Sequence, residues 1–297
     1  MNVNSVKKAV FCLVFALALS LGARQAVAGV EKVSLVYAPE EKDILSLRYD
    51  VFAGGFKALN ATMEMDLDKK AYDLALVAAT QGFIGSLFPW KAQYETSGHT
   101  NAAGAPIPTI STMRTTWKGG TKLTEMSYDP QGNLLKTTTQ EDGKTKTSRD
   151  TNAEMAKDSV DMLTGTLQMM QAVKNTEKCE GSFPVFDGKR RFDMKLQDEG
   201  VEELKKTKYS SFRGEAIRCT LKVVPVAGFK EKDKKRGWMA VQAHTEERKK
   251  PPTIWLARTE KNGPMVPVRM EIASAYGTVV AHLTSAVQKQ DKVASQH

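Results

Sequence analysis

The sequence predicts a mostly β protein: an antiparallel meander closed or curled into a barrel or spiral, with one main amphipathic helix. Apolar and polar residues alternate with a period of two over most of the chain after residue 44. Turn signals such as Asp129-Pro130-Gln131-Gly132-Asn133 and Asp187-Gly188 separate the alternating stretches. An open sheet of this size would expose long edges, so we expect it to close or curl.

Residues 1–28 have the pattern of a cleaved secretory signal peptide. Lys7 and Lys8 form a positive region before the apolar run from Ala9 to Leu21. Ala26-Val27-Ala28 then supplies the small-x-small cleavage sequence. The apolar run is too short to span a bilayer, which favours a cleaved leader over a membrane anchor.

The mature chain is expected to start at Gly29. Cys12 does not indicate a lipid anchor, because bulky Phe11 precedes it and more of the apolar run follows it. We therefore expect residues 29–297 to form a single β-barrel-like domain in the periplasm, with no transmembrane segment after cleavage.

The alternation places the first strands near residues 45–51, 59–67 and 72–78. Short breaks between them predict sequential antiparallel neighbours. Gly98 to Pro108 is expected to be a long surface loop. Later strands are expected at residues 110–117, 123–128, 134–139, 191–197, 217–226, 238–245, 254–259, 266–273 and 277–285.

The segment from Gln81 to Trp90 is the most unusual of the mature chain, because Phe83, Leu87, Phe88 and Trp90 crowd beside glycines and a proline. We expect a short helical turn or tight loop. Buried, the segment would be a plug that completes the core, and this interpretation is favoured. Exposed, it would be an apolar patch that marks lipid or partner contact.

The one helix is expected from Asp158 to Val173, where apolar residues recur at helical spacing. Asp158 or Thr151 is the candidate N-cap. Such a helix commonly packs across the mouth or concave face of a sheet. Its Met162 and Met169 are candidates for an adaptable ligand-binding lining, although core packing explains them as well and is favoured.

Cys179 and Cys219 are the only cysteines left after cleavage. In an oxidising compartment two such cysteines usually join, and neither lies in a CxxC pattern or near a histidine. We therefore favour a structural disulfide over a redox or metal-binding role. The chain-entropy model gives such a bridge about 4 kcal/mol of stabilisation.

The chain is basic, with a formal net charge of +9 that falls to +6 when Lys7, Lys8 and Arg24 leave with the leader. This surplus favours anionic envelope partners such as lipid, lipopolysaccharide or peptidoglycan over nucleic acid. The basic clusters, such as Lys205-Lys206-Thr207-Lys208, are interpreted first as solvated hairpin tips and second as polyanion-binding sites.

No sequence motif for catalysis is evident: the chain has no GxSxG elbow, HExxH pair, Walker loop or dinucleotide fingerprint. Its four histidines are scattered, and His244 near Glu246 is best explained as an exposed polar residue. We therefore expect no catalytic residues, no metal site and no cofactor, and not an enzyme. Carboxylates brought together by folding would be the exception.

Several blocks resemble a known family: Leu47-Arg48-Tyr49-Asp50-Val51, Gly82-Phe83, Leu87-Phe88-Pro89-Trp90, Pro184-Val185-Phe186-Asp187-Gly188, Arg218-Cys219 and Val224-Pro225-Val226-Ala227-Gly228-Phe229. In order and over most of the mature chain, they are similar to an exported proteobacterial family catalogued only as a domain of unknown function (family 3108). The resemblance implies a periplasmic β-barrel or β-spiral envelope protein. At fold level it also resembles half-barrel carriers of lipoprotein acyl chains.

Two functions are expected from these observations. The first is a non-enzymatic periplasmic protein that supports cell-envelope integrity by binding an envelope component or a partner protein. The alternative is a carrier or sensor of a lipid or acyl-chain ligand in a half-barrel cavity.

Overall fold

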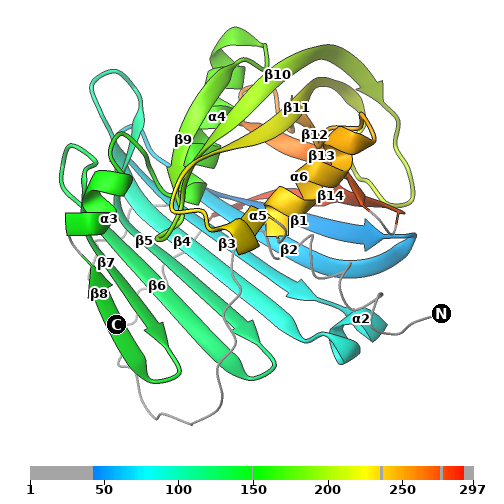
Figure 1. Ribbon diagram of the computed structural model, residues 1–297. Helices are drawn as coiled ribbons and strands as arrows, with labels where there is room; N and C mark the ends of the chain where they lie inside the picture. Colours follow the sequence, from blue (N-terminus) through cyan, green and yellow to red (C-terminus); the bar gives the residue numbers. More distant parts are fainter. Residues whose placement is uncertain (1–42, 149, 235–236, 275–276, 291–297) are drawn as a thin grey trace, which may run out of the picture.

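Every strand that the structure describes belongs to one antiparallel sheet (Figure 1). The structure is a computed structural model that describes residues 43–148, 150–234, 237–274 and 277–290, so the expected leader and its cleavage site lie outside the described residues. The sheet confirms the expectation of a mostly β protein, and its alternating burial confirms the period-two patterns, as in Trp90, Ala92 and Tyr94, which are buried between more exposed neighbours.

The elements follow one another along the chain as successive hairpins interrupted by two helical regions. The strands are β1 (Asp43–Ala53), β2 (Phe56–Leu67), β3 (Ala71–Thr80), β4 (Trp90–Thr100), β5 (Pro106–Trp117), β6 (Gly120–Tyr128), β7 (Leu134–Glu141), β8 (Lys144–Ser148), β9 (Gly181–Phe186), β10 (Arg191–Leu204), β11 (Gly214–Ala227), β12 (Thr253–Arg258), β13 (Met265–Ser274) and β14 (Gly277–Gln290). The helices are α2 (Gly82–Leu87), α3 (Asp150–Met155), α4 (Met162–Thr176), α5 (Glu231–Lys234) and α6 (Gly237–Glu247).

The strand order places the two ends of the described chain in the middle of the sheet. Strands β1 to β8 lie side by side in sequence order, β14 pairs with β1, and β13 back to β9 complete the other half. Helices α3 and α4 connect the last strand of the first half to the outermost strand of the second. The segment that contains α3 and α4 therefore carries the chain from one edge strand of the sheet, β8, to the other, β9.

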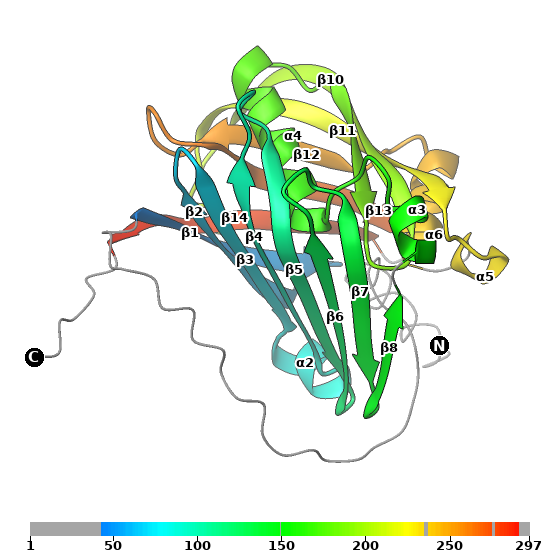
Figure 2. The same cartoon turned by 90° about the vertical axis from the view of Figure 1, so that its left-hand side faces the viewer.

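The sheet curls without closing. Its edge strands β8 and β9 do not pair with each other, so a closed barrel, one of the two expected forms, is wrong and the curled form is confirmed. Instead, Phe186 at the end of β9 is buried against Met126, Tyr128 and Leu134 of β6 and β7. The second half of the sheet therefore lies over the first (Figure 2). The end of β9 meets β6 and β7 through side chains instead of strand pairing.

Helix α4 lies within this roll, as expected for the amphipathic segment. It begins at Met162 with Asp161 as its N-cap, so the expected caps Asp158 and Thr151 are wrong. Asp158 has a positive φ of 56°, and Thr151 belongs to the separate short helix α3. The buried residues of α4, including Leu163, Leu167, Met170 and Val173, repeat at three or four positions and form the face that meets the sheet.

Three further expectations are wrong in detail. Residues 238–245 form most of helix α6 instead of a strand, because Met, Ala and Gln favour helix and the buried residues recur at helical spacing here. The Gly98 to Pro108 segment is no long loop, since β4 continues to Thr100 and β5 begins at Pro106. Strands β4, β8 and β9 were missed. Thr and Lys weaken the alternation of β4 and β8, and β9 is short and contains Pro184, which is unfavourable in a strand.

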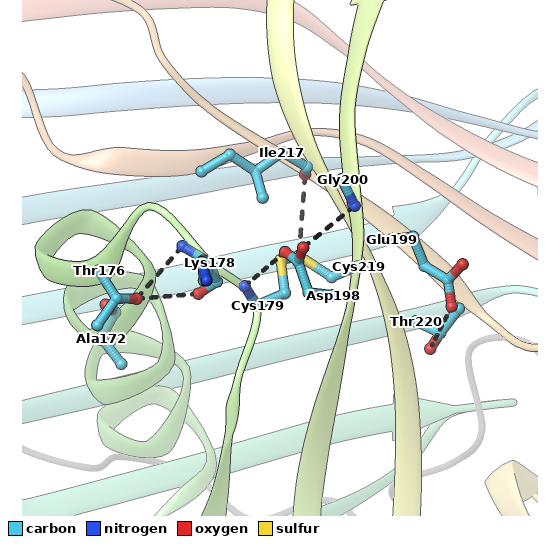
Figure 3. The surroundings of a disulfide bond; sticks show 10 residues. All are labelled: Ala172, Thr176, Lys178, Cys179, Asp198, Glu199, Gly200, Ile217, Cys219 and Thr220. Carbon is cyan, nitrogen blue, oxygen red and sulfur yellow. Dashed lines mark hydrogen bonds between the residues drawn. A yellow bond between two sulfur atoms is a disulfide. The ribbon is translucent and has the colours of Figure 1, made fainter.

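Cys179 and Cys219 form a disulfide, as expected (Figure 3). Both residues are fully buried, and their Cα atoms lie 5.5 Å apart. The Asp198 side chain accepts a 2.9 Å hydrogen bond from the Cys179 backbone N–H. Cys179 precedes the edge strand β9, and Cys219 lies in β11, two strands away in the sheet. The disulfide therefore ties the start of β9 to β11.

Candidate functional site

A cavity of about 650 Å³ lies between the two halves of the curled sheet. Its floor is the inner face of β1 to β4, and its roof comes from β10 to β13 together with α4 and α6. The lining is almost entirely apolar, with Leu76, Phe192 and Met270 among its side chains. Pockets of 300–1,000 Å³ with apolar walls are typical of small-molecule sites.

The cavity is hollow because small side chains occupy inward positions on its floor. Ala61 of β2 and Ala78 of β3 are direct cross-strand partners, and both line the cavity. Ala53 and Ala281 also line it. An alanine at an inward position leaves the space that a leucine or phenylalanine would fill, so these residues set the volume.

Helix α4 supplies the roof through Met162, Leu163 and Met169. Two of these, Met162 and Met169, are methionines predicted from the sequence as candidate lining residues, and the structure places both at the cavity. Met169 is buried and belongs to the main core, so packing and lining are the same role here. Unbranched thioether side chains of this kind adapt to irregular ligands.

Asp161 anchors the start of α4 to the cavity floor. Its carboxylate accepts hydrogen bonds from the Thr96 hydroxyl of β4 (2.7 Å), the Thr164 hydroxyl (2.5 Å) and the Leu163 backbone N–H (3.0 Å). The Tyr72 hydroxyl shares a 2.8 Å hydrogen bond with Thr164. Burial raises the pKa of the Asp161 carboxyl even though these donors oppose the shift.

Two polar side chains at the cavity, Tyr49 and Arg190, are engaged with protein partners. The Tyr49 hydroxyl donates a 3.0 Å hydrogen bond to the Pro267 carbonyl. Arg190 forms a 2.6 Å ion pair with Asp187 and lies over the Phe229 ring, 5.5 Å from its centroid. Burial raises the pKa of Tyr94 well above its usual value, and the negative charge of Asp187 adds to this effect. This arrangement suits an apolar ligand better than a charged substrate.

In the segment from Gln81 to Trp90, some side chains face the cavity and others face the surface. It is helical over α2, as expected, and Trp90 is buried and lines the cavity. Phe83 is 76% exposed and Leu87 is 51% exposed, so the favoured plug is wrong for both side chains. Phe88 is half-buried, and none of Phe83, Leu87 and Phe88 lines the cavity.

The cavity opens beside the β1–β2 turn, where its lining residues Gly54 and Phe56 are exposed. Ile84 of α2 also lines the cavity, and α2 is joined to this end of β2 by the 3.0 Å hydrogen bond from the Gln81 backbone N–H to the Ala58 carbonyl. We call the opening bounded by Gly54, Phe56 and Ile84 the mouth. Helix α6 lines the cavity through Met239 and is held to β11 by a 2.7 Å hydrogen bond from the Val223 backbone N–H to the Gln242 side chain.

Sequence reasoning missed most of the lining, including Ala61, Ala78 and Phe192. A signal existed in the alternation, because Ala61 and Ala78 occupy the apolar phase of their strands with unusually small side chains. Their meeting across a cavity depends on the curl, which local patterns do not specify.

The described residues contain no group of three or more His, Cys, Asp or Glu side chains placed to hold a metal ion. Among the same residues, no helix combines the length and apolar character needed to cross a membrane.

The basic clusters lie mainly away from the cavity. Lys205 to Lys208 occupy the exposed turn between β10 and β11, which is the hairpin tip expected for them. Arg191 forms a 2.5 Å ion pair with Asp193. Polyanion binding by these clusters stays a prediction.

Comparison with known proteins gives a family and no activity. A crystal structure of a β-barrel-like protein of domain of unknown function DUF1849 from Brucella abortus aligns with a TM-score of 0.45 and 11% identity, covering 84% of this chain and 99% of that chain. No curated protein matches the sequence. Residues 48–284 match the family described as "Protein of unknown function (DUF3108)". The match spans most of the chain and bears out the resemblance seen in the sequence blocks, so the protein belongs to the DUF3108 family.

Proposed function

We propose that this protein is a non-enzymatic carrier or sensor of a lipid or acyl-chain ligand, which it holds in the cavity between the halves of the curled sheet. The observation that carries the proposal is the apolar cavity of about 650 Å³ with an open mouth. This function is the alternative of the two expected from the sequence, and the cavity favours it over the envelope-integrity role that was placed first. Lipopolysaccharide, peptidoglycan and a partner protein remain less specific alternatives.

The chemistry of the walls supports an alkyl chain. Apolar surface removed from water contributes about 25 cal/mol per Å², so each buried methylene adds about 0.8 kcal/mol to binding. The polar side chains at the cavity, such as Tyr49 and Arg190, already have protein partners. A polar ligand would lose its hydration against walls that are almost entirely apolar, whereas an alkyl chain needs no hydrogen-bond partners.

We further propose that the protein works in the periplasm. The leader pattern in residues 1–28 and the Cys179–Cys219 disulfide support this location, because disulfides persist in oxidising compartments.

Displacement of a fluorescent fatty acid tests the proposal. The wild-type protein should bind the probe and release it to unlabelled palmitate. Ala78→Phe fills the space above the Ala61–Ala78 pair and should weaken probe binding about tenfold or more. Ala79→Phe is the matched control, since Ala79 is the next residue of the same strand and does not line the cavity.

Equal probe binding by the wild type and Ala78→Phe, with both variants folded by circular dichroism, would contradict binding in this cavity. Absence of probe binding by the detergent-free wild type would contradict the carrier role itself.

A further inference from the structure

The mouth carries the most exposed large apolar side chains of the described chain. Phe83 of α2 is 76% exposed and Phe56, just after the β1–β2 turn, is 74% exposed. Leu87 lies one helical turn after Phe83 on the same face of α2 and is 51% exposed. These three exposed apolar side chains lie at the same end of the sheet, and exposed apolar surface of this kind marks a contact site. We call Phe56, Phe83 and Leu87 the apolar rim.

The apolar rim is held outward by hydrogen bonds at both ends of α2. The Gln81 backbone N–H donates a 3.0 Å hydrogen bond to the Ala58 carbonyl of β2, which places α2 beside Phe56. At the other end, the Thr80 hydroxyl donates to the Phe88 carbonyl at 2.8 Å. Gly85 permits this close seating, because a Cβ there would lie 2.9 Å from the Thr80 carbonyl oxygen. The exposed side chains therefore belong to a fixed element.

Two exposed lysines flank the same helix. Lys91 and Lys118 line a small surface groove whose other residues include Gly82, Ser86 and Pro89. The Lys118 backbone N–H donates to the Pro89 carbonyl at 3.5 Å, which ties the β5–β6 turn to the end of α2. Among the described residues, neither lysine forms an ion pair. Positive charge thus accompanies the apolar rim at this end of the sheet.

We propose that the mouth end docks onto the surface of an anionic phospholipid bilayer, with Phe56, Phe83 and Leu87 inserted at the headgroup boundary and Lys91 and Lys118 facing the phosphates. Apolar insertion combined with lysine attraction is the physical basis of reversible membrane-surface binding. The rim borders the cavity mouth through Phe56, and Ile84 next to Phe83 also lines the cavity, so docking aligns the opening with the acyl chains. This inference rests on the proposed function, because docking has a role only if an acyl chain passes between the bilayer and the cavity.

Vesicle co-sedimentation tests the docking. The wild type should bind vesicles of phosphatidylcholine containing about one third phosphatidylglycerol, and should bind pure phosphatidylcholine vesicles at least about tenfold more weakly. Both Phe83→Ser/Leu87→Ser and Lys91→Glu/Lys118→Glu should lose about tenfold or more in affinity for the anionic vesicles. The loss in the lysine variant should shrink at high salt, because screening weakens attraction between surface charges.

Leu135→Ser/Val201→Ser is the matched control. Leu135 is 54% exposed and Val201 is 63% exposed, and both lie toward the opposite strand ends from the mouth. This control should bind anionic vesicles like the wild type. Equal vesicle binding by the rim variant and the control would overturn the proposal, and so would a wild type that leaves anionic vesicles unbound, as expected if the rim meets a protein instead.

Solution binding of the fluorescent fatty acid separates this inference from the proposed function. The rim variant Phe83→Ser/Leu87→Ser keeps every cavity-lining residue and should retain wild-type probe affinity. Retained probe binding with no vesicle binding by the wild type would contradict docking alone. Loss of probe binding by the wild type would contradict the proposed function, whatever the vesicles show.

Discussion

The Thr96 hydroxyl donates a 2.7 Å hydrogen bond to the Asp161 carboxylate and thereby joins strand β4 to the first turn of helix α4. The same carboxylate accepts from the Thr164 backbone N–H, so it caps the helix and fixes it to the sheet at once. Met162 and Leu163 follow Asp161 directly and line the cavity, so this hydrogen bond fixes the position of α4 relative to β4 on the other side of the cavity.

Asp161→Ala should lower the free energy of unfolding by about 2 kcal/mol or more, because it removes a helix cap and leaves buried donors unpaired. Asp161→Asn keeps one acceptor and should cost less. Urea unfolding followed by circular dichroism measures both. Asp158→Asn, at an exposed position outside the cap, is the control and should change stability little. Wild-type stability of Asp161→Ala would contradict the anchoring role.

The same buried carboxyl makes stability depend on pH. Its pKa is raised in the folded protein by burial, so the folded state binds a proton more readily than the unfolded state. This contribution to stability is present below the unfolded pKa of about 4 and is lost as pH rises through the raised folded value. Asp161→Asn should remove this dependence, which urea unfolding between about pH 4 and 7 would detect.

Gly98 should tolerate no side chain. A Cβ at this position would lie 2.5 Å from the Tyr72 ring and 2.2 Å from the Ile107 carbonyl oxygen. Tyr72 is also the residue that reaches Thr164 on α4. Gly98→Ala should therefore lower the unfolding free energy by about 1–3 kcal/mol. Gly263→Ala, where the nearest atom would be 3.4 Å away, is the comparison. Equal unfolding midpoints for the two variants would argue against this packing.

The Cys179–Cys219 bridge should act on the unfolded chain. Its 40-residue separation corresponds to about 4 kcal/mol in the chain-entropy model. Cys179→Ala/Cys219→Ala should melt below the oxidised parent and close to the reduced parent, as measured by differential scanning calorimetry with and without reductant. A parent that melts identically under both conditions would refute the stabilising role.

His282 should make the protein less stable in mild acid. It stacks on Tyr209 with ring centroids 6.1 Å apart, and burial together with the charge of Arg269 lowers its pKa, although Glu271 opposes the shift. As pH falls below the unfolded value of about 6.5, the unfolded state takes up a proton more readily than the folded state, so stability declines through the lowered folded value. His282→Gln should lose this decline and His99→Gln should keep it, as urea unfolding between about pH 7.5 and 5 would show. The same decline in all three proteins would assign it to other groups.

Local patterns predicted much of the fold. The alternation of Leu45, Leu47 and Tyr49 identified β1, and the spacing of Leu163, Leu167 and Met170 identified α4. These signals succeed because each element buries one face. Residues 238–245 failed because eight residues of mixed polarity satisfy neither period clearly, and burial against β13 decided the outcome.

The site was less predictable than the fold. Methionines at positions 162 and 169 were identified as candidate lining, and Trp90 as part of an unusual apolar segment. The facing pair Ala61 and Ala78 was not foreseen, because cavity volume depends on how far the sheet curls. Exposure of Phe83 and Leu87 likewise depends on where α2 sits at the mouth, which is a tertiary property.

If the cavity holds an acyl chain, native mass spectrometry of protein purified without detergent should detect it. We expect a population heavier than the bare chain by one lipid mass, which is lost on denaturation and reduced in Ala78→Phe but not in Ala79→Phe. A spectrum of bare protein alone, unchanged after incubation with phospholipid vesicles and with palmitate, would contradict it.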